Sequence, residues 1–204
     1  ANWFQKLEET LNFVEKNFFV IYNSHMRIIS GKHKGRNLLA PKTEDVRPTL
    51  DIVKQAFFTK MQFEIEGARF LDLFGGSGAI GIEALSRGAE VTICDNNPTS
   101  INLIRSNLKL IGESCDVELV DYKKFLKTNK KQFDIIYVDP PYEHTKAYAS
   151  ALKLIKENAQ LSTNGTVVCE SYFENRIDFS GFDIVCQKKY GTVVLTYLKP
   201  SQQN

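Results

Sequence analysis

The four residues Asp139-Pro140-Pro141-Tyr142 combine groups that suit the binding of an aromatic ring carrying an amino group. The two prolines have no backbone N–H and a fixed φ, so nearby carbonyl oxygens are not consumed by a helix and can point into a pocket. Asp139 adds a carboxylate acceptor and Tyr142 a flat ring. Together they could accept hydrogen bonds from an exocyclic amine while stacking on its ring, as when a nucleobase is held. The alternative is an acidic turn that closes a strand.

A buried strand is predicted directly before this motif. Residues 133–138 are apolar on both faces, short and rich in β-branched side chains, a pattern typical of a central parallel strand. The motif therefore falls at the carboxyl end of a strand. In open α/β sheets, ligands bind at this edge.

A glycine-rich turn is predicted between a buried strand and a helix within residues 69–85. Glycines allow backbone amides to approach a ligand closely, and the following helix directs its unpaired N–H groups toward the same place. Gly76-x-Gly78-x-x-Gly81 matches the dinucleotide-binding fingerprint, which is weak evidence when it stands alone.

Acidic residues end the next two predicted strands. Asp95 follows residues 90–94, where its carboxylate can accept hydrogen bonds from both hydroxyls of a ribose. Asp121 follows residues 117–120, where its carboxylate can accept from an adenine amine while the Tyr122 amide donates to a ring nitrogen; a surface turn is the alternative. The glycine turn and Asp95 together predict a cofactor that contains adenosine.

A basic hairpin is predicted at residues 26–42, with Lys32, His33, Lys34 and Arg36 at its tip. Such a tip suits contact with nucleic-acid phosphates, which position a strand without reading its sequence. A solvated hairpin with no partner explains the same pattern equally well.

The segment Arg47-Pro48-Thr49 leads into a helix predicted at about residues 50–61, with Thr49 as its N-cap. A helix amino terminus beside Arg47 could bind an anionic group. An ordinary capped helix is the alternative.

The remaining pattern predicts alternating helices and strands. Apolar residues spaced by three and four predict an amphipathic helix within residues 1–20. Further elements are expected as helices at 98–111, 123–131 and 146–158, a strand at 165–170 and a hairpin at 182–198. The terminal hairpin requires one late strand to run antiparallel.

Composition bounds the class of protein. The 204 residues suffice for one well-buried domain, and a net charge of +2 means that nucleic-acid binding would need a local basic patch. The four cysteines are scattered, which predicts reduced thiols and no metal site. No apolar run is long enough to span a bilayer and no secretory signal is evident, so a cytoplasmic location is expected.

Four segments, taken in order, resemble the RsmD family of bacterial 16S ribosomal RNA guanine-N2 methyltransferases. They are residues 26–31, Arg47-Pro48-Thr49, residues 70–89 and the Asp139 to Tyr142 motif, and the resemblance extends from residue 26 to about residue 199. The order of elements also resembles the α/β, Rossmann-like, seven-stranded fold of S-adenosylmethionine-dependent methyltransferases, with its terminal antiparallel hairpin.

The resemblance implies S-adenosylmethionine as the cofactor and S-adenosylhomocysteine as its product. The residues implied to bind the cofactor are Asp72, Phe74, Gly75, Gly76, Ser77 and Gly78 for the methionine part, Asp95 and Asn96 for the ribose, and Asp121 and Tyr122 for adenine. The residues implied to hold the guanine and catalyse transfer are Asp139, Pro140, Pro141 and Tyr142. The sequence departs from the family where Asp95 replaces a more frequent Glu and Asn97 an acid.

The expected substrate-side residues are Lys32, Lys34, Arg36, Arg47, Pro48 and Thr49. The expected partner is 16S ribosomal RNA within an assembling small subunit, bound by a monomer. The expected organisation is an amino-terminal helix or extension (1–25), a small RNA-side unit of hairpin and helix (26–62), the methyltransferase domain (63–200) and a polar tail (201–204).

Three other functions fit part of the sequence. An adenine-N6 DNA methyltransferase would use the same tetrapeptide, but such enzymes commonly carry a target-recognition domain for which this chain has no room. A nicotinamide dehydrogenase would leave the Asp139 motif and the terminal hairpin unexplained. A noncatalytic RNA-binding assembly factor would have no need of the intact motif.

Overall fold

The computed structural model describes residues 20–21, 26–41, 48–141 and 144–201. The helix predicted for the first twenty residues lies almost entirely outside them, as do Arg47 and Tyr142. Within the described residues, no helix combines the length and apolar character needed to cross a membrane.

A seven-stranded mixed sheet forms the centre of the molecule, with strand order β5-β4-β3-β6-β7-β9-β8. Its strands are β3 (Arg69–Asp72), β4 (Glu90–Asp95), β5 (Asp116–Leu119), β6 (Phe133–Val138), β7 (Leu161–Tyr172), β8 (Phe182–Tyr190) and β9 (Val193–Pro200). The first five are parallel, whereas β9 runs antiparallel to both β7 and β8. The predicted fold class and terminal hairpin are confirmed.

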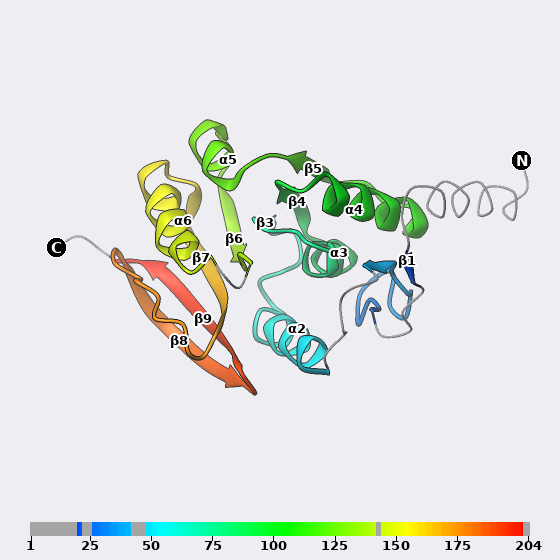
Figure 1. The fold of residues 1–204 in the computed structure, drawn as a ribbon, viewed down its shortest axis with the longest axis horizontal. Coiled ribbons are helices and arrows are strands. Elements are labelled where there is room, and N and C mark those ends of the chain that lie inside the picture. The colour runs from blue at the N-terminus through cyan, green and yellow to red at the C-terminus, as the bar shows by residue number, and fades with distance from the viewer. Residues whose placement is uncertain (1–19, 22–25, 42–47, 142–143, 202–204) are drawn as a thin grey trace, which may run out of the picture.

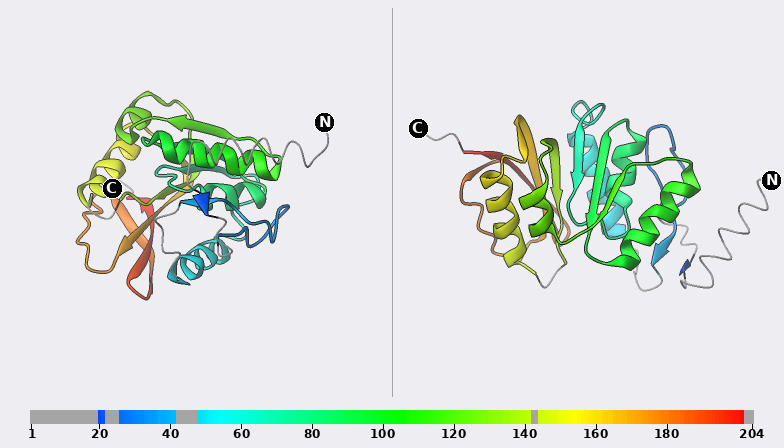
Figure 2. Two further views of the ribbon diagram at one scale, coloured as in Figure 1. Left: turned by 45° about the vertical axis from the view of Figure 1, so that its right-hand side comes forward. Right: turned by 90° about the horizontal axis from the view of Figure 1, so that it is seen from above.

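Helices cover both faces of the sheet (Figures 1 and 2). The helices are α2 (Pro48–Lys60), α3 (Ala79–Ser86), α4 (Pro98–Ile111), α5 (Tyr122–Thr128) and α6 (Lys146–Glu157). Side chains alternate between the faces along each strand. Phe70 therefore packs in one core with α2, α3 and α4, and Leu71 in the other core with α5 and α6.

Local sequence explains where several helices begin and end. The Asn97 side chain accepts from Thr99 N at 2.8 Å and Gly112 ends α4 in the left-handed conformation, so the helix matches its predicted bounds. The prediction that Thr49 caps α2 is wrong, because α2 already begins at Pro48. Proline is favoured in a first helical turn, where no N–H partner is required.

The predicted amino-terminal hairpin is present and is fixed to α3. An isolated antiparallel bridge joins Arg27 to Asn37. The fully buried Glu83 carboxylate of α3 accepts from the backbone N–H groups of Ile29 at 2.7 Å and Ser30 at 3.0 Å. Beyond the hairpin, β2 (Ala40–Pro41) pairs antiparallel with β1 (Val20–Ile21).

The hairpin tip packs against the carboxyl end of α3. The N–H of Lys32 donates to the Ser86 carbonyl at 2.7 Å, and a Cβ on Gly31 would lie 1.9 Å from that oxygen. The Lys32 ammonium and the buried His33 ring both contact Glu113 Oε1, at 2.6 and 2.7 Å. Part of the predicted cationic tip is therefore engaged within the protein.

Candidate functional site

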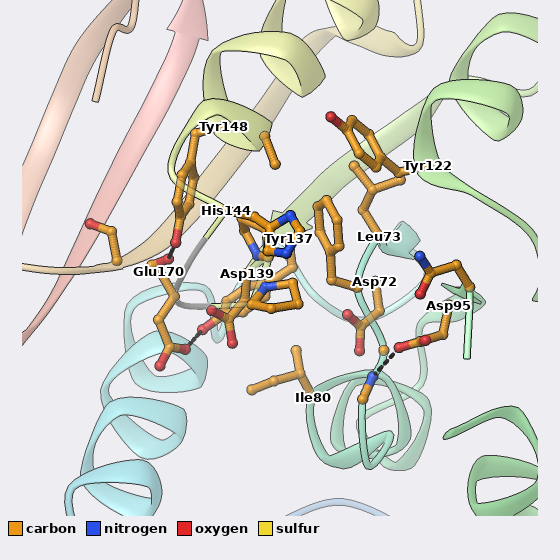
Figure 3. Close-up of a pocket in the computed structure, with 18 of the residues that line it drawn as sticks. Asp72, Leu73, Ile80, Asp95, Tyr122, Tyr137, Asp139, His144, Tyr148 and Glu170 are labelled. Carbon is orange, nitrogen blue, oxygen red and sulfur yellow. Dashed lines mark hydrogen bonds between the residues drawn. The ribbon is translucent and has the colours of Figure 1, made fainter. Parts of the chain in front are cut away.

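A cavity of about 1230 Å³ lies at the carboxyl edge of the parallel strands (Figure 3). Small-ligand pockets commonly measure about 300–1,000 Å³, so this cavity has room for a cofactor and a second group. Strands β3 and β6 are neighbours, and the chain reverses its direction of winding between them. Such a switch point is where open α/β sheets bind ligands.

Carboxylates from four strand ends line this cavity: Asp72 of β3, Asp95 of β4, Asp139 after β6 and Glu170 of β7. They meet because parallel strands end at the same edge. The sequence predicted the first three as site residues.

The glycine-rich turn between β3 and α3 is packed tightly on one side and open on the other. The N–H of Gly75 donates to the Cys94 carbonyl at 2.7 Å, and a Cβ on Gly75 would lie 2.4 Å from Ile93 Cγ2. By contrast, a Cβ on Gly76 would meet nothing within 4 Å, although its φ of +52° disfavours other residues. The turn thus leaves space for a ligand beside backbone amides. Gly78 then caps α3 in the left-handed conformation.

Asp72 is a buried carboxylate, only 2% exposed. Burial, reinforced by the nearby Asp95 charge, raises its pKa to about 7, although its Oδ2 accepts a hydrogen bond from Gly81 N at 3.0 Å. A cationic ligand would lower this pKa and stabilise the ionised form. Asp72 is thus suited to an ammonium or sulfonium group.

Both oxygens of Asp95 are held by backbone donors. Oδ2 accepts from Gly76 N at 2.8 Å and Oδ1 from Asn97 N at 2.7 Å, so the carboxylate joins the glycine turn to the end of β4. Each oxygen keeps a second lone pair. Asn96 also lines the cavity, and the arrangement suits a ligand with two neighbouring hydroxyls.

Part of the cavity wall is aromatic. Phe74 and Tyr122 line the cavity with ring centroids 5.1 Å apart and planes tilted by 46°. Asp121 Oδ1 accepts from Lys123 N at 2.9 Å and Lys124 N at 3.3 Å, which caps α5. Capping therefore accounts for one carboxylate oxygen of Asp121. The rings of Phe74 and Tyr122 offer a surface for a flat heterocycle.

The Asp139 motif enters the cavity from the end of β6. Asp139 is exposed and Pro140 buried, and both line the cavity together with Pro141. The N–H of His144 donates to the Pro141 carbonyl at 2.8 Å, which bends the chain into α6. Tyr142, the predicted stacking residue, lies outside the described residues.

Most of the predicted cofactor residues share this cavity. Those that line it are Asp72, Phe74, Gly75, Gly76, Ser77, Asp95, Asn96, Asp121 and Tyr122, whereas Gly78 is adjacent at the start of α3. The predicted phosphate contacts are not brought there: among the described residues, the lining includes none of Lys32, Lys34 and Arg36. The lining does include Asp51 and Lys54, so the first half of α2, the helix that Pro48 and Thr49 begin, borders the cavity.

Sequence reasoning missed several charged or polar residues of the cavity, among them Lys54, Tyr137 and Glu170. Lys54 is 4% exposed, and its ammonium donates to the Arg27 carbonyl at 2.7 Å and lies 3.9 Å from the Glu83 carboxylate. Burial lowers the pKa of Lys54. The signal for Glu170 was available, because it ends the strand predicted at residues 165–170, as Asp95 ends the strand predicted before it.

Within the described part of the chain, no group of three His, Cys, Asp or Glu residues is placed to hold a metal ion. All four cysteines are free, with Cys94 and Cys169 buried and Cys115 and Cys186 half-buried.

Comparison with known proteins matches residues 26–199 to the family described as conserved hypothetical protein 95. The Bacillus subtilis protein named "Putative rRNA methyltransferase YlbH" is 39% identical over 183 residues, which cover 85% of this chain and 99% of that protein. Escherichia coli ribosomal RNA small subunit methyltransferase D is 32% identical over 155 residues, which cover 75% of this chain and 78% of that protein.

A solved structure from Escherichia coli, named "Putative methyltransferase yhhF", superposes with a TM-score of 0.76 at 29% identity and covers 86% of this chain and 98% of its own. The similarity therefore extends over nearly the whole of that protein.

Proposed function

We propose that this chain is a ribosomal RNA methyltransferase that modifies the N2 amine of a guanine. The basis is its family, because the chain belongs to the RsmD family, described as conserved hypothetical protein 95. S-adenosylmethionine would supply the methyl group as an electrophile when bound. The substrate would be 16S ribosomal RNA, in keeping with the names of the relatives. We further propose that it works as a monomer in the cytoplasm on an assembling small subunit.

One observation carries this proposal. The glycine turn, Asp95 and the segment Asp139-Pro140-Pro141, which lie far apart in the sequence, line one cavity that is large enough for two ligands. A dehydrogenase or other nucleotide-binding protein needs only the first two of these features. The Asp139 motif adds acceptors for an amine beside the cofactor side.

The cofactor side fits a cationic nucleoside. Asp72 would hold the positively charged methionine part, Asp95 would accept from the ribose hydroxyls, and the adjoining rings of Phe74 and Tyr122 would contact the adenine. Because Asp72 is buried and its pKa is raised to about 7, a bound cation would offset the cost of its charge. This donor set favours a sulfonium cofactor over an anionic dinucleotide.

The amine side would act chiefly by positioning. The lone pair of an exocyclic amine is delocalised into its ring, so the nitrogen must be held pyramidal and in line with the methyl group. Asp139 and the Pro140 carbonyl would accept its two N–H bonds and Tyr142 would stack on the ring. The nitrogen becomes acidic as it attacks, and its proton can then leave to Asp139 or to water.

RNA phosphates would be bound in two places. The hairpin keeps Lys34 and Arg36 exposed, as the sequence suggested. Lys123 of α5 and Lys146 of α6 are exposed at the rim of the cavity itself. We propose that these rim lysines contact the phosphates next to the extruded base.

The proposal is tested by Asp139→Ala. Methyl transfer to small-subunit RNA should fall by about 100-fold or more, because an interaction that strengthens in the transition state is removed. Cofactor affinity, measured by calorimetry, should stay within about twofold of wild type, since Asp139 lies on the amine side. Asp183→Ala, which removes an exposed carboxylate from β8, is the matched control. Full transfer by the Asp139 variant would overturn the proposed mechanism.

A further inference from the structure

A second carboxylate lies beside Asp139 on the amine side of the cavity. Val138 pairs with Cys169 across β6 and β7, so Asp139 and Glu170 follow at matching positions on neighbouring strands. Both line the cavity (Figure 3). Burial raises the pKa of Tyr137, and the charges of Glu170 and Asp139 both add to this rise.

Glu170 is held in place by two tyrosines. The Tyr137 hydroxyl donates to Glu170 Oε2, and the Tyr148 hydroxyl of α6 donates to the Glu170 backbone carbonyl at 2.6 Å. Tyr137 is 1% exposed, and burial raises its pKa well above the ordinary value, so it remains a donor. Tyr137 thus accounts for one hydrogen bond to Glu170, and the carboxylate has further acceptor sites for a ligand.

Burial also raises the pKa of Glu170, whereas the hydrogen bond from Tyr137 lowers it. A further donor from a ligand would act in the same direction as Tyr137 and favour the carboxylate. The site is therefore built to receive an N–H or O–H group, although the side chain is only 8% exposed.

Guanine and adenine differ in what they present to such a pair of acceptors. Next to its N2 amine, guanine carries a proton on N1, so two donors lie side by side. Adenine carries a lone pair on N1 next to its N6 amine, and this lone pair would face the Glu170 carboxylate. A buried carboxylate that faces a lone pair in place of a donor loses more free energy than a single hydrogen bond contributes.

We propose that Glu170 selects guanine by accepting the hydrogen bond from N1–H while Asp139 and the Pro140 carbonyl receive the N2 amine. This inference rests on the proposed function and explains why an amine-binding motif shared with adenine-modifying enzymes would act on guanine here. Tyr137 is the positioning residue that keeps Glu170 oriented.

The inference is tested by combining Glu170→Gln with a change of base. Two RNAs are compared, one with the guanine that wild type methylates and one with 2-aminopurine at that position, which keeps the N2 amine but has a lone pair on N1. In the variant, the glutamine oxygen can accept from Tyr137 and its NH2 group then faces N1.

The measured quantity is the ratio of kcat/KM for guanine to that for 2-aminopurine. A hydrogen bond to a charged group corresponds to about 10- to 100-fold, so wild type should favour guanine by at least that factor and Glu170→Gln should lower the ratio by about 10-fold or more. The loss of O6 in 2-aminopurine affects both enzymes and cancels from the comparison.

Two further variants separate specificity from stability. Tyr137→Phe keeps both Glu170 oxygens but removes their donor, and should lower the same ratio by a smaller factor. Glu118→Gln removes an exposed carboxylate from β5 and should leave the ratio at its wild-type value. Cofactor affinity and melting temperature are measured for each variant.

The possible outcomes separate the role of Glu170 from the proposed function. If wild type methylates guanine N2 and both cavity variants keep the wild-type ratio, the role of Glu170 is refuted and the proposed function stands. If wild type methylates adenine instead, both are refuted.

Discussion

Replacing Asp72 by Asn should make the cofactor-free protein more stable above neutral pH while it weakens cofactor binding. Asp72 is 2% exposed and its pKa is raised from 3.8 to about 7, mainly by burial. The folded protein therefore holds a proton that the unfolded chain has already released between these values. Stability must fall as the pH rises from about 4 to about 7 and then level off.

The size of this effect follows from the shift in pKa. A difference of about three pH units corresponds to about 4 kcal/mol in the free energy of unfolding at pH 8, of which about 3 kcal/mol accrues between pH 5 and pH 8. Asn cannot ionise, yet its side-chain oxygen can still accept from Gly81 N. The difference in stability between Asp72→Asn and wild type should therefore grow by about 3 kcal/mol over that range.

Urea unfolding of the cofactor-free proteins at pH 5, 6, 7 and 8 measures this difference. Asp183→Asn, the same change at an exposed carboxylate of β8, should show no comparable trend. The cofactor affinity of wild type should improve as the pH rises toward 7, because the ionised carboxylate binds a cation, whereas the variant should bind weakly throughout. Parallel stability curves for wild type and Asp72→Asn would refute the assignment of this raised pKa.

Two other substitutions test the supports of the site. Glu83→Ala should lower the free energy of unfolding by about 3 kcal/mol, because it leaves buried donors unpaired, and should speed hydrogen exchange at Ile29 and Ser30. Glu90→Ala, at an exposed site on β4, is the control. Unchanged exchange in the Glu83 variant would contradict the anchoring role. The double substitution Lys123→Ala and Lys146→Ala should lower the salt slope of RNA binding by about 1 to 2, and an unchanged slope would remove these lysines from the phosphate contacts.

The carboxylates and glycines at the carboxyl edge of the sheet could be predicted because each of these features is local in the sequence. A buried strand that is followed by glycines or by an acidic residue predicts ligand-binding groups at the carboxyl edge of the sheet. This prediction does not depend on how the other elements pack. Asp95 and Asp139 were placed by this rule and Asp72 by the family resemblance, and the cavity contains all three. The same rule applied to Glu170 would have added it.

The surroundings of the hairpin could not be predicted, because they depend on contacts between distant segments. The sequence presents Lys32 and His33 as part of a cationic tip, but Glu113, some eighty residues later, binds both. Glu83 likewise reads as a polar residue on a helix, yet it is fully buried beneath the hairpin. A charge pattern alone does not distinguish an exposed cation from one paired within the protein.

The role of α2 depends on packing of the same kind. Phe57 and Phe58 place this helix in the core that contains β3 and β6, and Lys54 lines the cavity from it. The sequence grouped the helix with the hairpin as an RNA-side unit. Its contacts join it to the sheet and, through the bond from Lys54 to the Arg27 carbonyl, to the hairpin as well. The apolar face that predicts a helix does not indicate which surfaces will cover it.

The most direct test of the account is the identity of the methylated nucleoside. Purified protein is incubated with radiolabelled S-adenosylmethionine and, in parallel, with naked small-subunit RNA, with small ribosomal subunits lacking the modification, and with duplex DNA, and the products are digested to nucleosides. N2-methylguanosine is the expected product from a ribosomal substrate. N6-methyladenine from DNA, or no transfer despite demonstrated cofactor binding, would contradict it.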